Sequence, residues 1–375
     1  MIKKIFSHLN DSRRERIFLA AQRDLINVPR MTPNRVIDYL IAGLILALPV
    51  GFFALGIWMI FFNSEHLFMI LSGILALIFA WVIHPRVPDT QNRTIYSEEM
   101  PELFRMIDTI ADAQGVKSPD GFEVNRYFHA YTRTHGRLRR RSFIGVGMPN
   151  WWVRDDAERM AVLAQQLAHF GNGDPDQDWI IGLIFDTVLR WEEALTPQYN
   201  PVFGRSLGDL IFGGIQFFLR VPVSLLADVL LYLEFGTIQR ATYIADAMAA
   251  TVVGSDVVKS SLRKQAYEQA AWNAVPQLYP YAFDQNARIF DTMAAAVAAM
   301  PEAQRVAAVD AAQTRPHPLN ASAPPDGYRI AFLDALGDVP ARLPPQEFDF
   351  AAIAQELQPE ADKQGRKLMQ LYEVM

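Results

Sequence analysis

Two long apolar segments near the start of the chain constrain its fold more than any other feature. Tyr39 to Phe62 contains 24 residues without a charge, Leu67 to Ile83 contains 17, and only four residues separate them. A helix of about 20 apolar residues is long enough to cross the hydrocarbon core of a bilayer. We therefore predict a transmembrane helical hairpin within residues 36–84, with its two spans at 39–62 and 67–83.

The basic residues around this hairpin predict its orientation. Residues 1–35 form a basic segment with eight Lys or Arg, Arg86 and Arg93 follow the second span, and the loop between the spans has neither Lys nor Arg. By the positive-inside rule, both ends of the hairpin are cytoplasmic. We expect a multi-pass protein of the inner (plasma) membrane, in contact with the lipid bilayer, whose N-terminus and main domain lie in the cytoplasm.

A short basic helix is predicted before the hairpin, over Ser12 to Ile26. Ile17, Ala21 and Leu25 recur there at a spacing of four residues, which places them on one face of a helix. Two interpretations remain open. The helix lies on the membrane surface, or it is a solvated cytoplasmic helix.

Composition limits the class of protein. Hydrophobic residues make up 51% of the chain and charged residues 20%, which favours a membrane anchor combined with a sizeable globular domain. The formal net charge is −6, whereas general nucleic-acid binding needs a dominant basic surface, so we expect no nucleic-acid partner. The chain has no Cys, which excludes disulfides, thiolate metal sites and Cys nucleophiles.

Beyond the hairpin, the pattern alternates between helices and short strands. An amphipathic helix is expected over Glu99 to Gln114, and strands are expected at Phe122 to Val124 and at Phe143 to Val146. The basic run Arg137 to Arg141 reads as a hairpin tip, either solvated or touching anionic lipid headgroups. Residues 337–375 are a Pro-rich connection followed by a helix over Ala351 to Tyr372. The fold class is therefore α+β, with a mainly helical domain over 95–336.

A hydrophobic helical insertion is expected at residues 177–234 of this domain. Trp179 to Leu189 reads as a core helix. Arg220 and Pro222 interrupt the longer apolar stretch that follows, and a central Arg costs roughly 2.5 to 3.5 kcal/mol on insertion into a membrane. A bent helical pair, partly buried or on the membrane surface, is therefore favoured over a second transmembrane hairpin. The sequence leaves open whether 208–234 spans the membrane, lies on it or is buried away from it.

Two helical segments carry the residues of most chemical interest. The first begins at Asp155, where Glu158 completes a capping box, and places Gln165 and His169 four residues apart on one face. The second covers Gln239 to Ala250 and places Thr242 and Asp246 one turn apart. A His-Pro pair and an Arg-Ile pair follow at residues 317–318 and 329–330.

The order of these motifs resembles the membrane-associated zinc metallopeptidases that include the bacterial heat-shock membrane peptidase and the CAAX prenyl endopeptidase, the His-Glu-x-x-His gluzincins. In that family a His-Glu-x-x-His helix, often followed by Gly-Asp, precedes hydrophobic helices. The motif Arg-x-x-Glu-x-x-Ala-Asp then supplies the third zinc ligand, and His-Pro and Arg-Ile come last. From about residue 99 to 336 this chain keeps the flanking pairs, which are Gly173-Asp174, Ala245-Asp246, His317-Pro318 and Arg329-Ile330. The resemblance implies a zincin-like peptidase domain with a small β-sheet.

Carried over residue by residue, the resemblance places Gln165 and His169 at the first two zinc ligands, Thr242 at the third, and Gln166 at the general base. The motif's Arg position falls on Gln239. Amide and hydroxyl oxygens neither replace imidazole and carboxylate as zinc ligands nor accept a proton from water near neutral pH. We therefore expect no metal, no cofactor and no catalytic residue, and we interpret His169 as a hydrogen-bonded interior residue.

Three further residues fall at positions that support the ligands or face the substrate in the family, namely Asp246, His317 and Arg329. We expect Asp246 and Arg329 to form a buried polar pair that keeps the cleft in shape.

The preferred hypothesis is a catalytically degenerate homologue, a pseudopeptidase that binds a polypeptide or partner subunit at the cytoplasmic face of the membrane without cleaving it. The alternative is an active zinc metalloendopeptidase in membrane-protein quality control, with an unusual ligand set that recruits His317 or a nearby acid. A purely structural anchor for the C-terminal helix is a third, minor hypothesis.

Overall fold

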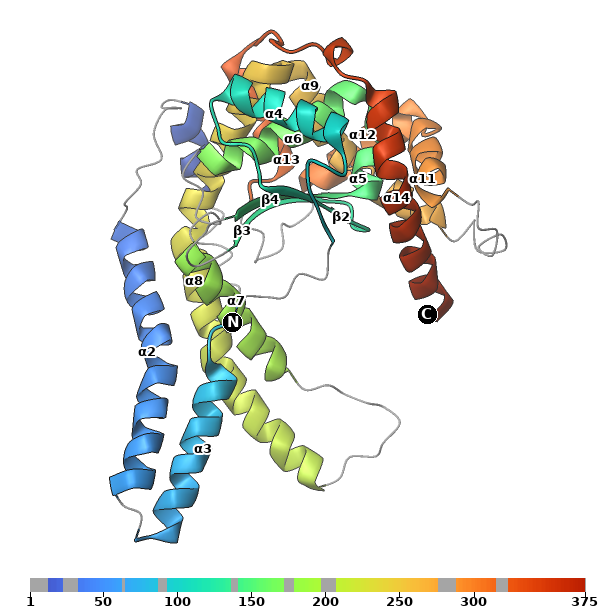
Figure 1. The fold of residues 1–375 in the computed structure, drawn as a ribbon. Helices are drawn as coiled ribbons and strands as arrows, with labels where there is room; N and C mark the ends of the chain where they lie inside the picture. Colours follow the sequence, from blue (N-terminus) through green and yellow to red (C-terminus); the bar gives the residue numbers. More distant parts are fainter. Residues whose placement is uncertain are drawn as a thin grey trace. The chain divides into compact units, whose positions relative to one another are not determined.

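The computed structural model describes residues 13–22, 33–62, 65–86, 93–135, 141–171, 179–196, 207–275, 288–314 and 323–374. These residues are mainly helical and form one four-stranded sheet (Figure 1), which confirms the expected mainly helical chain with a small sheet. The chain divides into two compact units. Unit 1 comprises Met1–Asn10, Pro29–Asp89 and Asp178–Phe235; unit 2 comprises Asp11–Val28, Thr90–Gln177 and Gly236–Met375.

Unit 1 consists, where it is described, of apolar helices. These are α2 (Pro33–Phe62), α3 (Leu67–Ile83), α7 (Trp179–Ala194) and the first part of α8 (Leu207–Val253). The two predicted hairpin helices are thus present as α2 and α3. Among the described residues, two segments are long and apolar enough to cross a membrane, Asn34–Phe62 in α2 and Gln216–Val253 in α8, whereas α3 is a shorter apolar helix.

Small and branched side chains hold unit 1 together. A buried cluster joins α2, α7 and α8 through Ala42, Ile45, Ile184, Val188, Ala227 and Leu230. α2 and α3 approach each other closely at Gly56 and Gly73, where a Cβ added to either residue would lie 2.8 Å from the backbone oxygen of the other. Such close backbone approach is available only to glycine.

The sequence predicted a bent pair of helices around Arg220. That prediction is wrong, because α8 is one continuous helix that also contains Thr242 and Asp246. A glutamate on α7 offsets the charge of Arg220, since the guanidinium lies 3.5 Å from the carboxylate of Glu192. Pro222 lies inside the helix; proline removes one backbone donor but does not prevent the helix from resuming beyond it. Trp179–Ala194 confirms the predicted helix after residue 178.

Unit 2 is built around a mixed sheet with strand order β1-β2-β4-β3. The strands are β1 (Thr94–Ile95), β2 (Gly121–Asn125), β3 (Ala130–His135) and β4 (Arg141–Gly147). β2 pairs with β4 in parallel, and β1–β2 and β3–β4 pair antiparallel. The two predicted strands are confirmed as β2 and β4, whereas β1 and β3 were not predicted.

Helices cover one face of this sheet, and Figure 1 shows α4 and α6 lying over it. The described helices of unit 2 that follow β1 are α4 (Pro101–Gln114), α5 (Met148–Trp152), α6 (Asp156–Gly171), the remainder of α8, α9 (Ser255–Gln265), α10 (Glu268–Asn273), α11 (Ile289–Ala298), α12 (Glu302–Thr314), α13 (Asp326–Leu336), the short η3 (Pro345–Glu347) and α14 (Phe350–Val374). The predicted C-terminal helix is confirmed as α14, which packs against α4 and β2.

Local signals set the ends of the key helices. At the start of α6, the backbone N–H of Glu158 donates to Asp155 at 2.9 Å and that of Asp155 donates to Glu158 at 3.0 Å, which confirms the predicted capping box. α4 ends at Gly115 with φ 66°, and α8 ends before Gly254 with φ 91°. Both conformations favour glycine because it lacks a Cβ.

The N-terminal helix covers residues 13–22, and the fold encloses its apolar face, which neither interpretation of the sequence foresaw. Ile17 and Ala21 are each only 8% exposed, and Phe18 packs against Tyr243 and Tyr328. The apolar face of this helix is therefore neither on a membrane surface nor solvated, because it is buried within unit 2.

Candidate functional site

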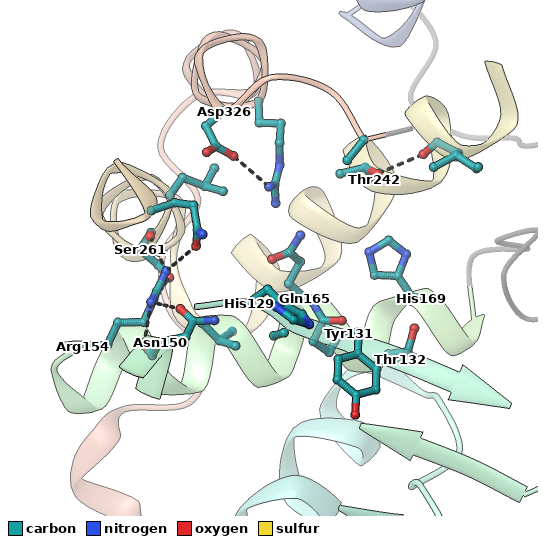
Figure 2. Close-up of a pocket in the computed structure, with 18 residues that line it drawn as sticks. His129, Tyr131, Thr132, Asn150, Arg154, Gln165, His169, Thr242, Ser261 and Asp326 are labelled. Atoms are coloured by element: carbon teal, nitrogen blue, oxygen red, sulfur yellow. Dashed lines mark hydrogen bonds and ion pairs between the residues drawn. The ribbon is translucent and has the colours of Figure 1, made fainter. Parts of the chain in front are cut away.

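A cavity of about 320 Å³ in unit 2 brings together the positions that the sequence singled out. Residues of β3, α6, α8, α9 and α13 line it. Figure 2 shows Gln165 and His169 reaching into it from α6, with Thr242 on the α8 side. Gln166 and Arg329 line the same cavity, so helices that are distant in sequence converge on it.

α6 contributes three polar side chains to the cavity. Gln166 is 7% exposed, whereas Gln165 and His169 are half-buried. His169 is thus a half-buried lining residue of the cavity. A carboxamide offers both a donor and an acceptor but carries no charge, so this wall of the cavity is hydrogen-bonding and neutral around one imidazole.

Thr242 faces α6 from α8. Its side chain is buried, and its hydroxyl donates to the backbone oxygen of Ile238 at 2.9 Å. Threonine within a helix commonly makes this bond to the carbonyl four residues earlier. The hydroxyl therefore serves the helix backbone, and its oxygen carries no charge to offer a cation.

Asp246 and Arg329 form the buried pair that was predicted. The guanidinium donates to the two carboxylate oxygens at 2.8 Å and 2.6 Å, and a third bond at 3.1 Å reaches Asp326. Burial disfavours the charge, but the attraction and hydrogen bonds of Asp246 outweigh it, so the pKa of Arg329 lies above its ordinary value. This bidentate geometry joins α8 to α13 at the edge of the cavity.

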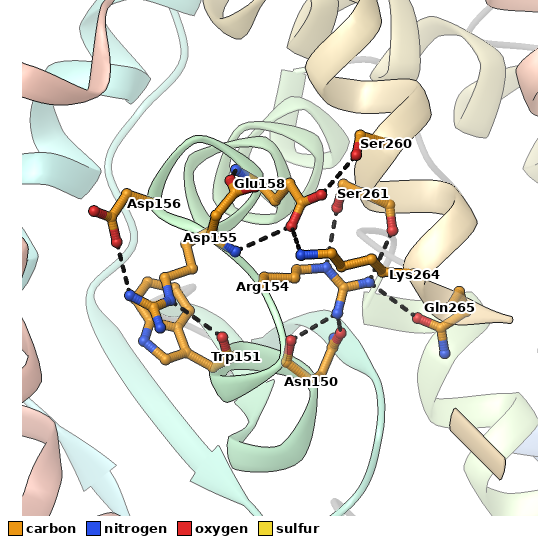
Figure 3. A network of polar contacts seen from close by, with 11 residues as sticks. Asn150, Trp151, Arg154, Asp155, Asp156, Glu158, Ser260, Ser261, Lys264 and Gln265 are labelled. Carbon is orange, nitrogen blue, oxygen red and sulfur yellow. Dashed lines mark hydrogen bonds and ion pairs between the residues drawn. The ribbon is translucent and has the colours of Figure 1, made fainter. Parts of the chain in front are cut away.

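Arg154 is a second buried arginine of the lining, and it is held differently (Figure 3). Its guanidinium donates to the backbone and side-chain oxygens of Asn150 and Ser261 and to the side-chain oxygen of Gln265. All five acceptors are uncharged. Burial lowers the pKa of Arg154 to about 10, because attraction by Glu158 offsets only part of the desolvation. The side chain is still a cation at neutral pH.

The start of α6 is also tied to α9. Glu158 accepts from the hydroxyl of Ser260 at 2.7 Å and from the ammonium of Lys264 at 2.5 Å. Gln265 extends the network to the segment before β3, since its amide donates to the backbone oxygen of Phe128 at 2.9 Å. These contacts fix the elements that surround one end of the cavity.

Sequence reasoning missed several polar lining residues, among them His129, Asn150, Arg154, Ser261, Gln265, Asp326, Tyr131 and Thr132. β3 had not been predicted, so nothing pointed to Tyr131 and Thr132. The capping box marked the start of α6, but no local signal tied Arg154 to Ser261, which is 107 residues away.

Other predicted residues fall outside the residues the structure describes. These are His317-Pro318, Gly173-Asp174 and most of the basic run that begins at Arg137.

The lining does not fit a zinc ion at the positions that the resemblance implies. Zinc sites in proteins use imidazole, thiolate and carboxylate ligands, whereas Gln165 and Thr242 offer neutral oxygens beside one imidazole, that of His169. Within the described ranges, no group of three His, Asp or Glu side chains is placed to hold a metal ion.

Comparison of the chain with protein-family models, with curated proteins and with solved structures finds no match. The likeness to zinc metallopeptidases therefore rests on the motifs of the sequence.

Proposed function

We propose that the chain is a non-catalytic relative of membrane-associated zinc metallopeptidases, in which the zincin-like unit 2 binds a polypeptide or a partner subunit without cleaving it. One observation carries the proposal. Gln165, Gln166, His169, Thr242 and Arg329, chosen from sequence motifs alone, line one cavity. The positions that the resemblance assigns to an active site thus come together, while their side chains lack the chemistry of a zinc peptidase.

The polarity of the cavity supports a polypeptide main chain as ligand. The five donors of Arg154 are taken up by protein acceptors, and Arg329 is paired with Asp246 and Asp326. The carboxamides of Gln165 and Gln166 present donors and acceptors together. A peptide group also has one donor and one acceptor, so such a lining is complementary to a main chain.

The apolar helices of unit 1 support a membrane location. α2 exposes many large apolar side chains, among them Leu40, Leu44, Phe61 and Phe62. We propose that the chain is a multi-pass protein of the inner membrane with unit 2 in the cytoplasm, an orientation supported by the basic residues that flank α2 and α3.

Metal analysis tests whether the chain has lost the ability to bind zinc. Purified native protein is expected to contain no stoichiometric zinc, whereas the triple variant Gln165→His, Gln166→Glu, Thr242→Glu is expected to bind one zinc ion per chain, because it restores two charged or imidazole ligands beside His169. Gln165→His alone is the matched control and is expected to stay nearly metal-free. Stoichiometric zinc in the native protein, with chelator-sensitive cleavage of polypeptides, would instead support an active peptidase.

A binding measurement tests whether the cavity binds a polypeptide. The full-length protein in detergent is titrated into a fluorescent, permanently unfolded polypeptide, reduced and carboxymethylated lactalbumin. Gln165→Trp, which fills the cavity, is expected to weaken binding at least about tenfold, equivalent to ~1.4 kcal/mol. Asp108→Trp on the exposed side of α4 is the control and should leave affinity unchanged. If the two variants bind the polypeptide with equal affinity, the cavity is not the binding site.

A further inference from the structure

The helix over residues 13–22 packs behind the part of α8 and α13 that lines the cavity. The ring of Phe18 lies 5.1 Å from that of Tyr328, edge-on, and 6.3 Å from that of Tyr243. Tyr243 follows Thr242, and Tyr328 precedes Arg329. The aromatic contacts of this helix are therefore made by the immediate neighbours of two lining residues.

A glycine permits this packing. A Cβ added to Gly236 on α8 would lie 3.5 Å from a guanidinium nitrogen of Arg13 and 3.6 Å from Cδ1 of Ile17. These are ordinary van der Waals distances, so an alanine fits, whereas a larger side chain would push the helix away. Gly236→Ala, which fits, and Gly236→Leu, which does not, are therefore a matched pair of substitutions.

The contact also buries a hydroxyl group that has no hydrogen-bond partner among the described residues. Tyr243 is 1% exposed, and its hydroxyl has no hydrogen-bond partner in the described part of the chain. A buried hydroxyl without a partner favours opening, because water would satisfy it. The docked position is therefore stabilised by apolar packing and opposed by this one group.

We propose that the helix over residues 13–22 regulates the cavity. When the helix is docked, it holds Tyr243 and Tyr328 in place and so fixes the α8–α13 wall, the side of the cavity formed by Thr242 and Arg329. When the helix is released, this wall loosens and ligand binding weakens. The control of ligand affinity rests on the proposed polypeptide-binding function, whereas the control of the wall itself does not.

Hydrogen exchange of the full-length protein in detergent tests the control of the wall. Phe18→Ala and Gly236→Leu are expected to accelerate exchange in α13 and in α8 beyond Ile238 several-fold, while α4 exchanges as in the native protein. Leu19→Ala, at a position 44% exposed, Gly236→Ala and the conservative Phe18→Tyr are expected to behave like the native protein. Unchanged exchange in α13, or equal acceleration in α4 and α13, would overturn the proposal.

The reverse experiment tests the coupling to ligand. Because coupling between two sites is reciprocal, saturating the native protein with the carboxymethylated lactalbumin probe is expected to slow exchange in residues 13–22, and Phe18→Ala is expected to weaken probe binding by about fivefold or more. If the probe binds but exchange in 13–22 does not change, the coupling is wrong and the proposed function stands. If the probe does not bind, the proposed function fails, and the exchange of the variants still decides the control of the wall.

Discussion

Two buried arginines line the same cavity and are stabilised in opposite ways. Arg329 is paired with the carboxylates of Asp246 and Asp326, and its pKa lies above the ordinary value. Arg154 is surrounded by neutral oxygens, and burial lowers its pKa to about 10. The comparison shows that a buried cation can be held either by opposite charge or by a complete set of uncharged acceptors.

The two sites differ in the groups that lose their partner when the arginine is substituted. Without Arg329, the fully buried carboxylate of Asp246 would lose its cationic partner and two hydrogen bonds. Without Arg154, only neutral oxygens lose a donor, and these lie beside a cavity that can admit water. A lone buried charge costs more than an unpaired neutral group, so the two arginine sites should respond unequally to substitution.

The largest effect is expected when the Asp246–Arg329 pair is broken. Asp246→Ala or Arg329→Met should destabilise the packing of α13 on α8 by about 3 to 5 kcal/mol, the usual cost of leaving one partner of a buried ion pair. The free energy of opening, from hydrogen exchange in α13, measures it. The double variant Asp246→Leu, Arg329→Met is the control and should recover most of the loss; a double variant as unstable as the single ones would contradict this account.

A smaller effect is expected at the other arginine. Arg154→Met should cost about 1 to 3 kcal/mol, because it removes hydrogen bonds to neutral acceptors but also a desolvated charge. Exchange in α9 measures this loss, and the exposed Arg263→Met on the same helix is the control. If Arg154→Met proved as costly as Arg329→Met, the contrast between the two sites would be lost.

The smallest effect is expected at the outer partner of Arg329. Asp326→Asn should cost about 0.5 to 1 kcal/mol, since the side chain of Asp326 is 31% exposed and the bidentate bond to Asp246 stays intact. Thermal unfolding of the variant beside the native protein measures it. A loss as large as that of Asp246→Ala would show that Asp326, rather than Asp246, anchors the guanidinium.

Local patterns were enough to predict the parts of the molecule that depend on near neighbours. The capping box of Asp155 and Glu158, the end of α4 at Gly115, and strands β2 and β4 all follow from signals a few residues apart. The pairing of Asp246 with Arg329 was predicted from the resemblance, because both residues belong to its motifs.

Partners distant in sequence account for what was missed. Arg220 indicated a break in the apolar stretch, but Glu192 on another helix offsets its charge and α8 continues. The face of Ile17 and Ala21 suited a membrane surface equally well, and only the fold shows the aromatic rings that cover it. Likewise, the acceptors of Arg154 come together only when α9 packs beside α6.

The capping box of α6 lies about three turns before Gln165, Gln166 and His169 on the same helix. Its bonds to Asp155, Ser260 and Lys264 secure the helix without any help from those three residues. Substitutions at Gln165, Gln166 and His169 should therefore carry little penalty in foldability. The same independence makes this helix a tolerant place to install new ligands by design.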